Sequence, residues 1–317
     1  MILDFIRDNL NGDTWEKWCD DCYRDRYQSD NYTKIQASHL GDAGFEGFTM
    51  NGIVYQCYCP EKYYTDNELY EHLREKVTKD INKLISKDNA KRISKLGIHK
   101  IKEWHFVIPE YKDKRIIEHL EVKRLEVLRM KESDAATFEY IDDNIRLVIK
   151  TAEDFKEELI RLIRNPLVDI KLNAAVKSIK DVDWTTCEAE KSKNIKRKLI
   201  ALMGTDEGED FAEMLKFWSE AYLKGIEIMH ELQCTCGAIY EDLFELEQQY
   251  KKDVSAQSRM NRDMSLNNSI FNEILNNFET ALANEFKCFS QPTIMELKRD
   301  LVSGWLADCS LQFKAGI

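Results

Sequence analysis

Four side chains with oxygen ligands follow one another along the first part of the chain in an order that could bind a divalent cation. Glu16 lies in a segment with helical apolar spacing, Asp42 and Glu46 lie in a glycine-rich turn, and Gln56 lies in an apolar stretch typical of a buried strand. Carboxylate and amide oxygens suit Mg²⁺, which keeps several waters of its own. Phosphodiester hydrolysis assisted by a metal needs a small set of such ligands. The four residues therefore predict a Mg²⁺ or Mn²⁺ site.

Three kinds of element must position these side chains. A helix is expected over 13–27, capped by Asp13 or Thr14, and strands are expected over 32–37 and 52–58, the second ended by Pro60. The apolar face of this helix is expected to contain Trp15, Trp18, Cys19 and Cys22.

A second group of elements follows Thr65. Thr65 and Glu68 have the spacing of a capping box, which predicts a long helix to about Ser86 or beyond. The following segments are expected to form a strand (104–109), a helix (113–130), a hairpin around Asp142-Asp143-Asn144 (137–149) and a capped helix (151–165).

Strand signals end at Pro166, and the rest of the chain has helical spacing. The helical candidates are 170–180, 187–203, 208–233, 236–252, 265–287 and 293–314. The residue before a proline is biased out of the helix, which favours a boundary at 165–167. The expected fold class is α+β. An α/β domain with a central mixed sheet flanked by helices spans 1–165, and an all-α domain spans 166–317.

Charge is distributed unevenly along the 317 residues. The chain has 46 Lys+Arg and 57 Asp+Glu, a formal balance of −11, which argues against wholesale coating of nucleic acid. Residues 1–70 hold 6 basic and 13 acidic side chains, a balance of −7, whereas residues 71–131 hold 17 and 10, a balance of +7. An acidic stretch beside a basic one is what a metal-dependent enzyme acting on phosphodiesters needs.

Lysines recur at helical spacing in the basic stretch. This cationic stripe consists of Lys76, Lys79, Lys83, Lys87, Lys91 and Lys95. It could bind the phosphates of a DNA backbone with a salt-dependent affinity. The alternative is the ordinary solvated face of an amphipathic helix.

The order of these motifs resembles the Mrr-type branch of the PD-(D/E)xK restriction-endonuclease-like superfamily. That branch has an aromatic–Glu pair on its first helix, a "GDGGIDG" turn and a strand ending in "QxK". The matching residues are Trp15-Glu16, the turn Gly41–Gly47, and Gln56-Cys57-Tyr58. The resemblance covers roughly residues 10–110.

The resemblance implies a role for each matching residue. Glu46 falls where the family has its metal-binding Asp, Glu16 matches the helix acid that can hold a second ion or its water, and Gln56 would offer its amide oxygen to the metal. The family's catalytic lysine falls on Tyr58, and a phenol with an ordinary pKa near 10 cannot supply that positive charge. Lys62 is the proposed substitute cation, and Lys76 is a second candidate.

The activity implied by the resemblance is metal-dependent DNA cleavage, by an effector of bacterial anti-phage or restriction-type defence. The alternative is a degenerate nuclease-fold subunit that binds DNA or a partner ATPase without cutting. The sequence has no phosphate-binding loop of the Gly-Lys-Ser/Thr type, so no nucleotide cofactor is expected, and sensing is assigned to a separate partner protein, such as an ATPase. The helical domain is the expected place for contacts within a homo-oligomer.

The nine cysteines do not predict zinc. Cys19 and Cys22 share the apolar side of a helix, which favours core packing over metal binding. No apolar run reaches the roughly 18 residues of a membrane helix, and the first residues lack the pattern of a signal peptide. The sequence therefore predicts a cytoplasmic protein with reduced thiols and no membrane partner.

Overall fold

The computed structural model describes residues 1–36, 43–168, 170–174, 187–308 and 310–313. The chain forms two compact units, which we call the sheet unit (Arg7–Leu162) and the helical unit (Met1–Ile6 with Ile163–Ile317). The first six residues fall in the helical unit, whereas the sequence placed them in the α/β domain. Their helix α1 (Ile2–Ile6) buries four apolar side chains, and the Asn173 backbone N–H donates to the carbonyl oxygen of Phe5 over 2.8 Å.

The sheet unit is built on five strands in the order β1-β2-β3-β4-β5. The strands are β1 (Thr33–Lys34), β2 (Gly47–Phe48), β3 (Ile53–Cys57), β4 (Ile101–Val107) and β5 (Ile141–Lys150). The first three pair antiparallel, and β3, β4 and β5 pair parallel. The expected mixed sheet is therefore confirmed, together with the α+β fold class.

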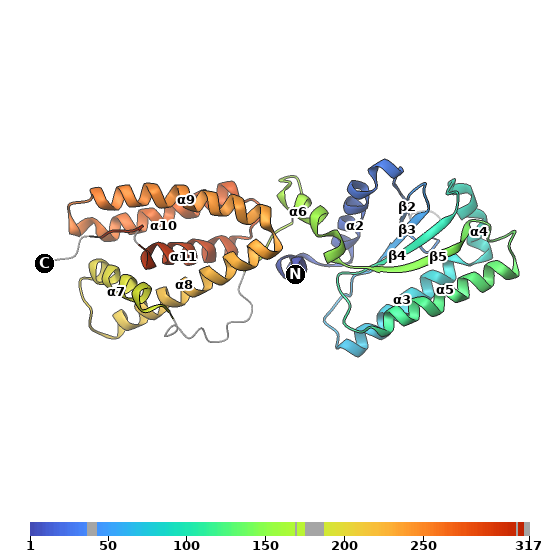
Figure 1. The fold of residues 1–317 in the computed structure, drawn as a ribbon, viewed down its shortest axis with the longest axis horizontal. Helices are drawn as coiled ribbons and strands as arrows, with labels where there is room; N and C mark the ends of the chain where they lie inside the picture. The colour runs from blue at the N-terminus through green and yellow to red at the C-terminus, as the bar shows by residue number, and fades with distance from the viewer. Residues whose placement is uncertain (37–42, 169, 175–186, 309, 314–317) are drawn as a thin grey trace. The chain divides into compact units, whose positions relative to one another are not determined.

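Helices cover both faces of this sheet (Figure 1). Helices α3 (Asp66–Leu84) and α5 (Arg115–Ser133) pack against one face, where Val54, Trp104 and Phe106 belong to a large apolar core. Helix α2 (Gly12–Arg26) lies over the other face and brings Tyr23 onto the Tyr55 ring, with ring centroids 4.0 Å apart. Because successive strand residues point to opposite faces, β3 separates these two environments.

Local capping fixes where α2 and α3 begin. Thr65 caps α3, and its side chain and that of Glu68 form the predicted capping box. Asn11, one turn earlier than expected, caps α2 through a hydrogen bond with the Thr14 backbone N–H. The Trp15 indole N–H then donates to the Val107 carbonyl oxygen at 3.3 Å, which anchors the start of α2 at the end of β4.

The helix after Thr65 is shorter than the sequence predicted. It ends at Leu84, and a separate helix α4 (Lys87–Ile93) is followed by a 3-10 turn η3 (Ser94–Leu96). The lysine stripe is therefore distributed over three elements instead of one continuous helix. Lys76, Lys79 and Lys83 lie on α3, Lys87 and Lys91 on α4, and Lys95 on η3.

The predicted hairpin over 137–149 is wrong. Residues 141–150 form the single strand β5, parallel to β4. Between the pairs Ile101↔Ile141 and Glu103↔Arg146 the register shifts, so β5 holds extra residues there. These extra residues include Asp142-Asp143-Asn144. The turn-forming residues make a bulge at the sheet edge, where an irregular strand is tolerated.

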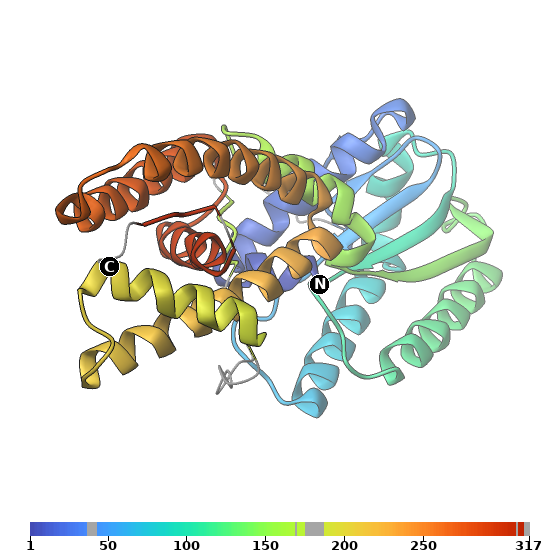
Figure 2. The same cartoon turned by 60° about the vertical axis from the view of Figure 1, so that its left-hand side comes forward.

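The helical unit contains helices at five of the six ranges expected after Pro166 (Figure 2). The exception is 170–180: residues 170–174 are not helical, and Leu172 forms a bridge with Phe289, whereas 175–180 lie outside the described residues. The five helices are α7 (Ala189–Met203), α8 (Glu209–Thr235), α9 (Gly237–Met260), α10 (Asn267–Glu285) and α11 (Gln291–Ala307), and α6 (Lys156–Arg164) precedes them. Trp305 is fully buried among them, and its indole N–H donates to Glu247 at 2.9 Å. Among the described residues, none of the helices is both long and apolar enough to cross a membrane.

Candidate metal-binding site at the end of strand β3

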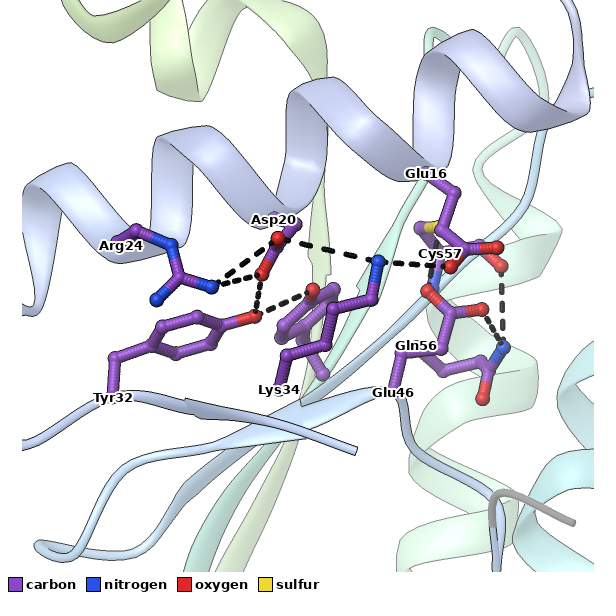
Figure 3. Close-up of polar contacts among 9 residues, drawn as sticks. Glu16, Asp20, Arg24, Tyr32, Lys34, Glu46, Gln56 and Cys57 are labelled. Atoms are coloured by element: carbon purple, nitrogen blue, oxygen red, sulfur yellow. Dashed lines mark hydrogen bonds and ion pairs between the residues drawn. The ribbon is translucent and has the colours of Figure 1, made fainter. Parts of the chain in front are cut away.

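Glu46 is held at the edge of the sheet by contacts from β3. It immediately precedes β2, and its backbone N–H donates to the Tyr55 carbonyl oxygen at 2.7 Å. The Gln56 amide nitrogen donates to Glu46 Oε1 at 2.5 Å. The Cys57 thiol and the Cys57 backbone N–H donate to Oε2 at 2.7 and 3.3 Å. The turn acid and the strand amide of the sequence prediction are therefore in direct contact (Figure 3).

Gln56 has a buried polar atom in an unusual environment. Its side chain is 1% exposed, and its Oε1 atom is buried with no hydrogen-bond partner among the described residues. A buried polar atom without a partner costs free energy, so it calls for an explanation. Rotation of the amide by half a turn would direct this oxygen to the same side as the Glu46 carboxylate. A cation placed there could be coordinated by both the amide oxygen and the carboxylate.

Glu16 approaches from helix α2 on the other side of the carboxylate cluster. Its Oε1 lies 3.1 Å from the Nζ of Lys34, and Asp20, one turn later on the same helix, lies 4.0 Å from that Nζ. The charge of Glu16 also acts on Glu46. Figure 3 shows Lys34 projecting from β1 between the two helix acids and Glu46.

Lys34 is a site residue that the sequence analysis missed. The antiparallel pairing of β1 with β2 sets Lys34 opposite Gly47, and the Ile35 N–H donates to the Glu46 carbonyl oxygen at 2.7 Å. Burial on its own would lower the pKa of Lys34, but the hydrogen bond with Glu16 and the charges of Asp20, Glu16 and Glu46 outweigh it and raise that pKa. Lys34 is therefore a fixed positive charge among carboxylates. Its only sequence signal was its place in a predicted strand.

Glu46 has an unusually high proton affinity. Burial, reinforced by the charge of Glu16, raises its pKa from 4.5 to about 7, although hydrogen bonds from Cys57 and the charge of Lys76 oppose the shift. The hydrogen bond between Cys19 and Cys57, together with burial, raises the pKa of the Cys57 thiol well above its ordinary value. The thiol therefore remains protonated and donates to Glu46. A carboxylate with a pKa near neutrality is typical of a functional site.

A tyrosine network supports the Lys34 end of the site. The Tyr32 hydroxyl donates to Asp20 at 2.5 Å and lies 2.9 Å from the Tyr55 hydroxyl. Arg24 pairs with Asp20 at 3.2 Å from the next turn of α2. These contacts restrain Asp20 on the side opposite Lys34 and so fix the acidic face of the helix.

The structure places the two substitute cations of the sequence analysis in other contacts. Lys62 Nζ lies 5.4 Å from the centroid of the Tyr64 ring. Lys76 pairs with Asp80 at 2.8 Å, although its charge still acts on Glu46. Tyr58, in the family's lysine position, continues the β3–β4 ladder, since its N–H donates to the Val107 carbonyl oxygen at 2.9 Å. Lys34 is thus the lysine whose ammonium group the structure brings to Glu16.

The lysine stripe is divided by its partners. Lys76 and Lys83 both pair with Asp80, which is 0% exposed, at 2.8 and 3.2 Å. Lys87 pairs with Asp134 at 2.9 Å, an exposed contact of small energetic value. The remaining members are exposed: Lys79, Lys91 and Lys95. Asp42, the other metal ligand predicted from the sequence, lies outside the described residues.

The donor set fits a hard divalent cation better than a soft one. Within the described ranges, no group of three or more His, Cys, Asp or Glu side chains is arranged to hold a metal ion. The candidate set is of a different composition: two carboxylates, Glu16 and Glu46, with the amide oxygen of Gln56 once the amide is rotated toward Glu46. Oxygen donors of this kind suit Mg²⁺ or Mn²⁺.

Comparisons with protein-family models, with curated proteins and with solved structures give no significant match for this chain.

Proposed function

We propose that the sheet unit is a metal-dependent DNA endonuclease that hydrolyses phosphodiester bonds at the edge formed by Glu46 and Gln56. The observation that carries the proposal is the contact of Glu46 with Gln56, beside the pair formed by Glu16 and Lys34. Carboxylates, an amide oxygen and a lysine are the groups that the resemblance to the Mrr-type branch requires; Glu16, Glu46 and Gln56 follow its order, whereas Lys34 comes from an earlier point in the chain. Lys34 takes the role for which the sequence offered Lys62.

Each side chain has a task in this reaction. Glu46 and Gln56 would hold Mg²⁺, and Glu16 would hold a second ion or its water. The bound ion would make a coordinated water more acidic and neutralise charge on the scissile phosphate. Lys34 supplies a fixed cation that orients the attacking water and stabilises negative charge on the phosphate oxygens as the transition state forms. Glu46 must lose its proton before it can serve as a ligand.

The exposed lysines would hold the DNA. Lys79, Lys87, Lys91 and Lys95 are exposed, so each is available to phosphates, although Lys87 must leave Asp134. Lys76 and Lys83 are held by Asp80 and contribute less. This division refines the stripe of six lysines: the members on α4 and η3 are expected to carry most of the salt-dependent affinity.

The wider setting comes from the resemblance alone. The protein would act as an effector of bacterial anti-phage or restriction-type defence, held in check by a separate sensor such as an ATPase. The helical unit is the proposed surface for that partner or for a second copy. Large apolar side chains exposed on it, Phe217 (41%), Ile226 (53%) and Phe244 (44%), support this assignment.

A second candidate function is supported by the hydrogen bonds of Glu46. Both of its carboxylate oxygens already accept hydrogen bonds, and Tyr58 stands in the lysine position. Such a closed cluster would suit a nuclease-fold subunit that binds DNA or a partner protein without cutting. In that case the raised pKa of Glu46 reflects a protonated, structural carboxyl.

Cleavage of plasmid DNA separates the two candidates. The full chain, with Mg²⁺ or Mn²⁺, is expected to nick or linearise the plasmid, and Glu46→Ala is expected to abolish cutting. Glu118→Ala is the matched control, because it removes an exposed acid on α5 that the site does not use. If wild-type protein cuts no form of DNA, or if Glu46→Ala cuts as well as wild type, the endonuclease proposal is wrong.

DNA binding without metal tests the lysines separately. Reversal of Lys87, Lys91 and Lys95 to Glu is expected to weaken binding and to reduce the slope of log affinity against log salt by roughly 0.9 for each lost phosphate contact. The same reversal at Lys216, Lys252 and Lys287, three exposed lysines of the helical unit, is the charge-matched control. An unchanged slope would assign the stripe to an ordinary solvated face.

A further inference from the structure

A cavity of about 380 Å³ opens where β3 and β4 end. Its walls come from the residues after β3, beginning at Cys59, and after β4, beginning at Pro109, with Arg7 and Leu10 from the segment before α2. Cys59 is three residues beyond Gln56, so the chain runs directly from the candidate metal site into the cavity wall. In open sheets with parallel strands, ligands bind at the carboxyl ends of the strands.

The lining of this cavity combines aromatic rings with cations. Tyr63 is 82% exposed at the wall, and the Tyr64 ring is fixed against His72, with ring centroids 4.3 Å apart. Lys62 lies over the Tyr64 ring. Lys112 also lines the cavity. A flat apolar surface with ammonium groups at its margin is how proteins bind unpaired bases together with their phosphates.

The acidic side chains of the cavity do not neutralise all of its positive charge. Glu110 is paired with Arg7 at 2.8 Å, and Lys112 lies 3.8 Å from the exposed Asp66, a surface pair of small energetic value, which leaves Lys62 and Glu61. An exposed tyrosine such as Tyr63 has no packing role to explain it, since it lies mostly in solvent. The volume is at the lower end of the roughly 300–1,000 Å³ of small-ligand pockets, which suits one nucleotide and not a base pair.

We propose that this cavity, which we call the strand-end pocket, holds one unpaired nucleotide of a DNA strand beside the cleaved bond. The base stacks on Tyr63 and Tyr64, and Lys62 and Lys112 contact the adjoining phosphates. The proposal deepens the proposed function, because it makes single-stranded or locally unpaired DNA the preferred substrate. It also gives Lys62 a role in binding.

Binding measured without metal tests the pocket apart from cleavage. Fluorescence anisotropy with labelled oligo(dT) in EDTA compares wild-type protein with Tyr63→Ala and with Tyr63→Ala/Tyr64→Ala. Loss of stacking is expected to weaken single-strand binding roughly 5- to 150-fold per base. Tyr63→Phe/Tyr64→Phe keeps both rings and is expected to bind as wild type. Phe244→Ala removes an exposed ring from the helical unit and is the control for a general loss of aromatic surface.

Three results would overturn the proposal. One is unchanged single-strand affinity in Tyr63→Ala. Because this side chain is exposed, its removal is not expected to unfold the protein. Another is that Tyr63→Ala loses as much affinity for the annealed duplex of this strand with its complement as it loses for oligo(dT). The third is competition by dTMP as strong as competition by the unlabelled strand, which would indicate a pocket for a free nucleotide. Strand binding through Tyr63 by a protein that never cuts would uphold the pocket and refute the endonuclease.

Discussion

The Nζ of Lys34 lies 3.1 Å from Oε1 of Glu16, although the two residues come from a helix and an edge strand that share no sequence motif. This ion pair places a fixed positive charge beside the acidic cluster. In the sequence motif of that cluster, Tyr58 stands where a lysine was expected. In the proposed reaction this positive charge would come from β1, which pairs with β2, and not from the position of Tyr58 after β3.

Replacement of Lys34 should therefore reduce cleavage sharply. Lys34→Ala is expected to lower kcat by about 100-fold or more, because a preorganised positive charge is lost from the transition state. Lys34→Arg keeps the charge and should recover part of the rate. Lys100→Ala, which changes the lysine just before β4, at the opposite end of the strands from Gln56, is the control. Plasmid cleavage by Lys34→Ala at the wild-type rate would exclude Lys34 from the reaction.

Replacement of Glu46 by Gln should stabilise the fold while it removes activity. The pKa of Glu46 is raised from 4.5 to about 7, so folding disfavours the charged form, and stability is lost as the pH rises from 4.5 through 7. Glu46→Gln removes this cost, which is about 3 kcal/mol at pH 8. Thermal unfolding in EDTA at pH 5 and pH 8 measures it. The gain should appear at pH 8 and be small at pH 5, and a loss of stability at both pH values would contradict the argument.

His105 should make the sheet unit sensitive to acid. It is 1% exposed, between the Tyr23 hydroxyl at 2.7 Å and Glu103 at 2.9 Å, and Arg146 pairs with Glu103 at the edge of this group. Burial lowers the pKa of His105, helped by Lys150 and Arg146 and opposed by Glu103. A histidine with a depressed folded pKa is protonated more easily in the unfolded chain, so stability is lost as the pH falls below about 6.5.

Because only one group titrates, the loss of stability with falling pH has an upper limit. His105→Gln is expected to flatten the decline in unfolding free energy below pH 6.5, which is at most about 1.4 kcal/mol per pH unit for a single group. His99→Gln alters an exposed histidine and should leave the decline as in wild type. Denaturant unfolding at several pH values provides the comparison, and identical profiles for His105→Gln and wild type would refute the assignment.

Gly44 should be intolerant of a side chain. Its φ is +92°, and a Cβ there would lie 2.4 Å from the Asp80 carbonyl oxygen on α3. Gly44→Ala is expected to cost more than about 2 kcal/mol and to lower Tm by roughly 5 °C or more. Gly12→Ala meets no atom within 4 Å and is the matched control. Equal Tm values for the two variants would show that α3 moves away at little cost.

Elements defined by local signals could be predicted from the sequence. The capping box of Thr65 and Glu68 and the apolar alternation around β3 depend on neighbours within a few residues, and both predictions are confirmed. The hairpin over 137–149 failed because Asp142-Asp143-Asn144 has local turn propensity, which pairing with β4 overrides. Parallel pairing depends on a strand some 40 residues away and leaves no local signal.

The same distinction applies to the site. The structure brings together Glu46 and Gln56, which are ten residues apart in one strand–turn–strand unit. Their use as metal ligands remains a prediction. Lys34 was missed because its position depends on which strand pairs with β2, and the short β1 gives little pattern to read. Lys62 was chosen for its closeness in sequence to Tyr58, whereas the chain turns after Pro60 and carries it into the strand-end pocket.

The division of the chain also constrains the order in which the protein can fold. Phe5 is paired through its carbonyl with Asn173, 168 positions later, whereas the sheet unit between them draws its contacts from residues 7–162. During synthesis the sheet unit can complete its core while α1 still lacks the helices that cover it. Ile2, Leu3, Phe5 and Ile6 must then wait as exposed apolar side chains until the last helices are made. A chaperone that shields short apolar segments would therefore act on α1 until the helices that follow Pro166 have been made.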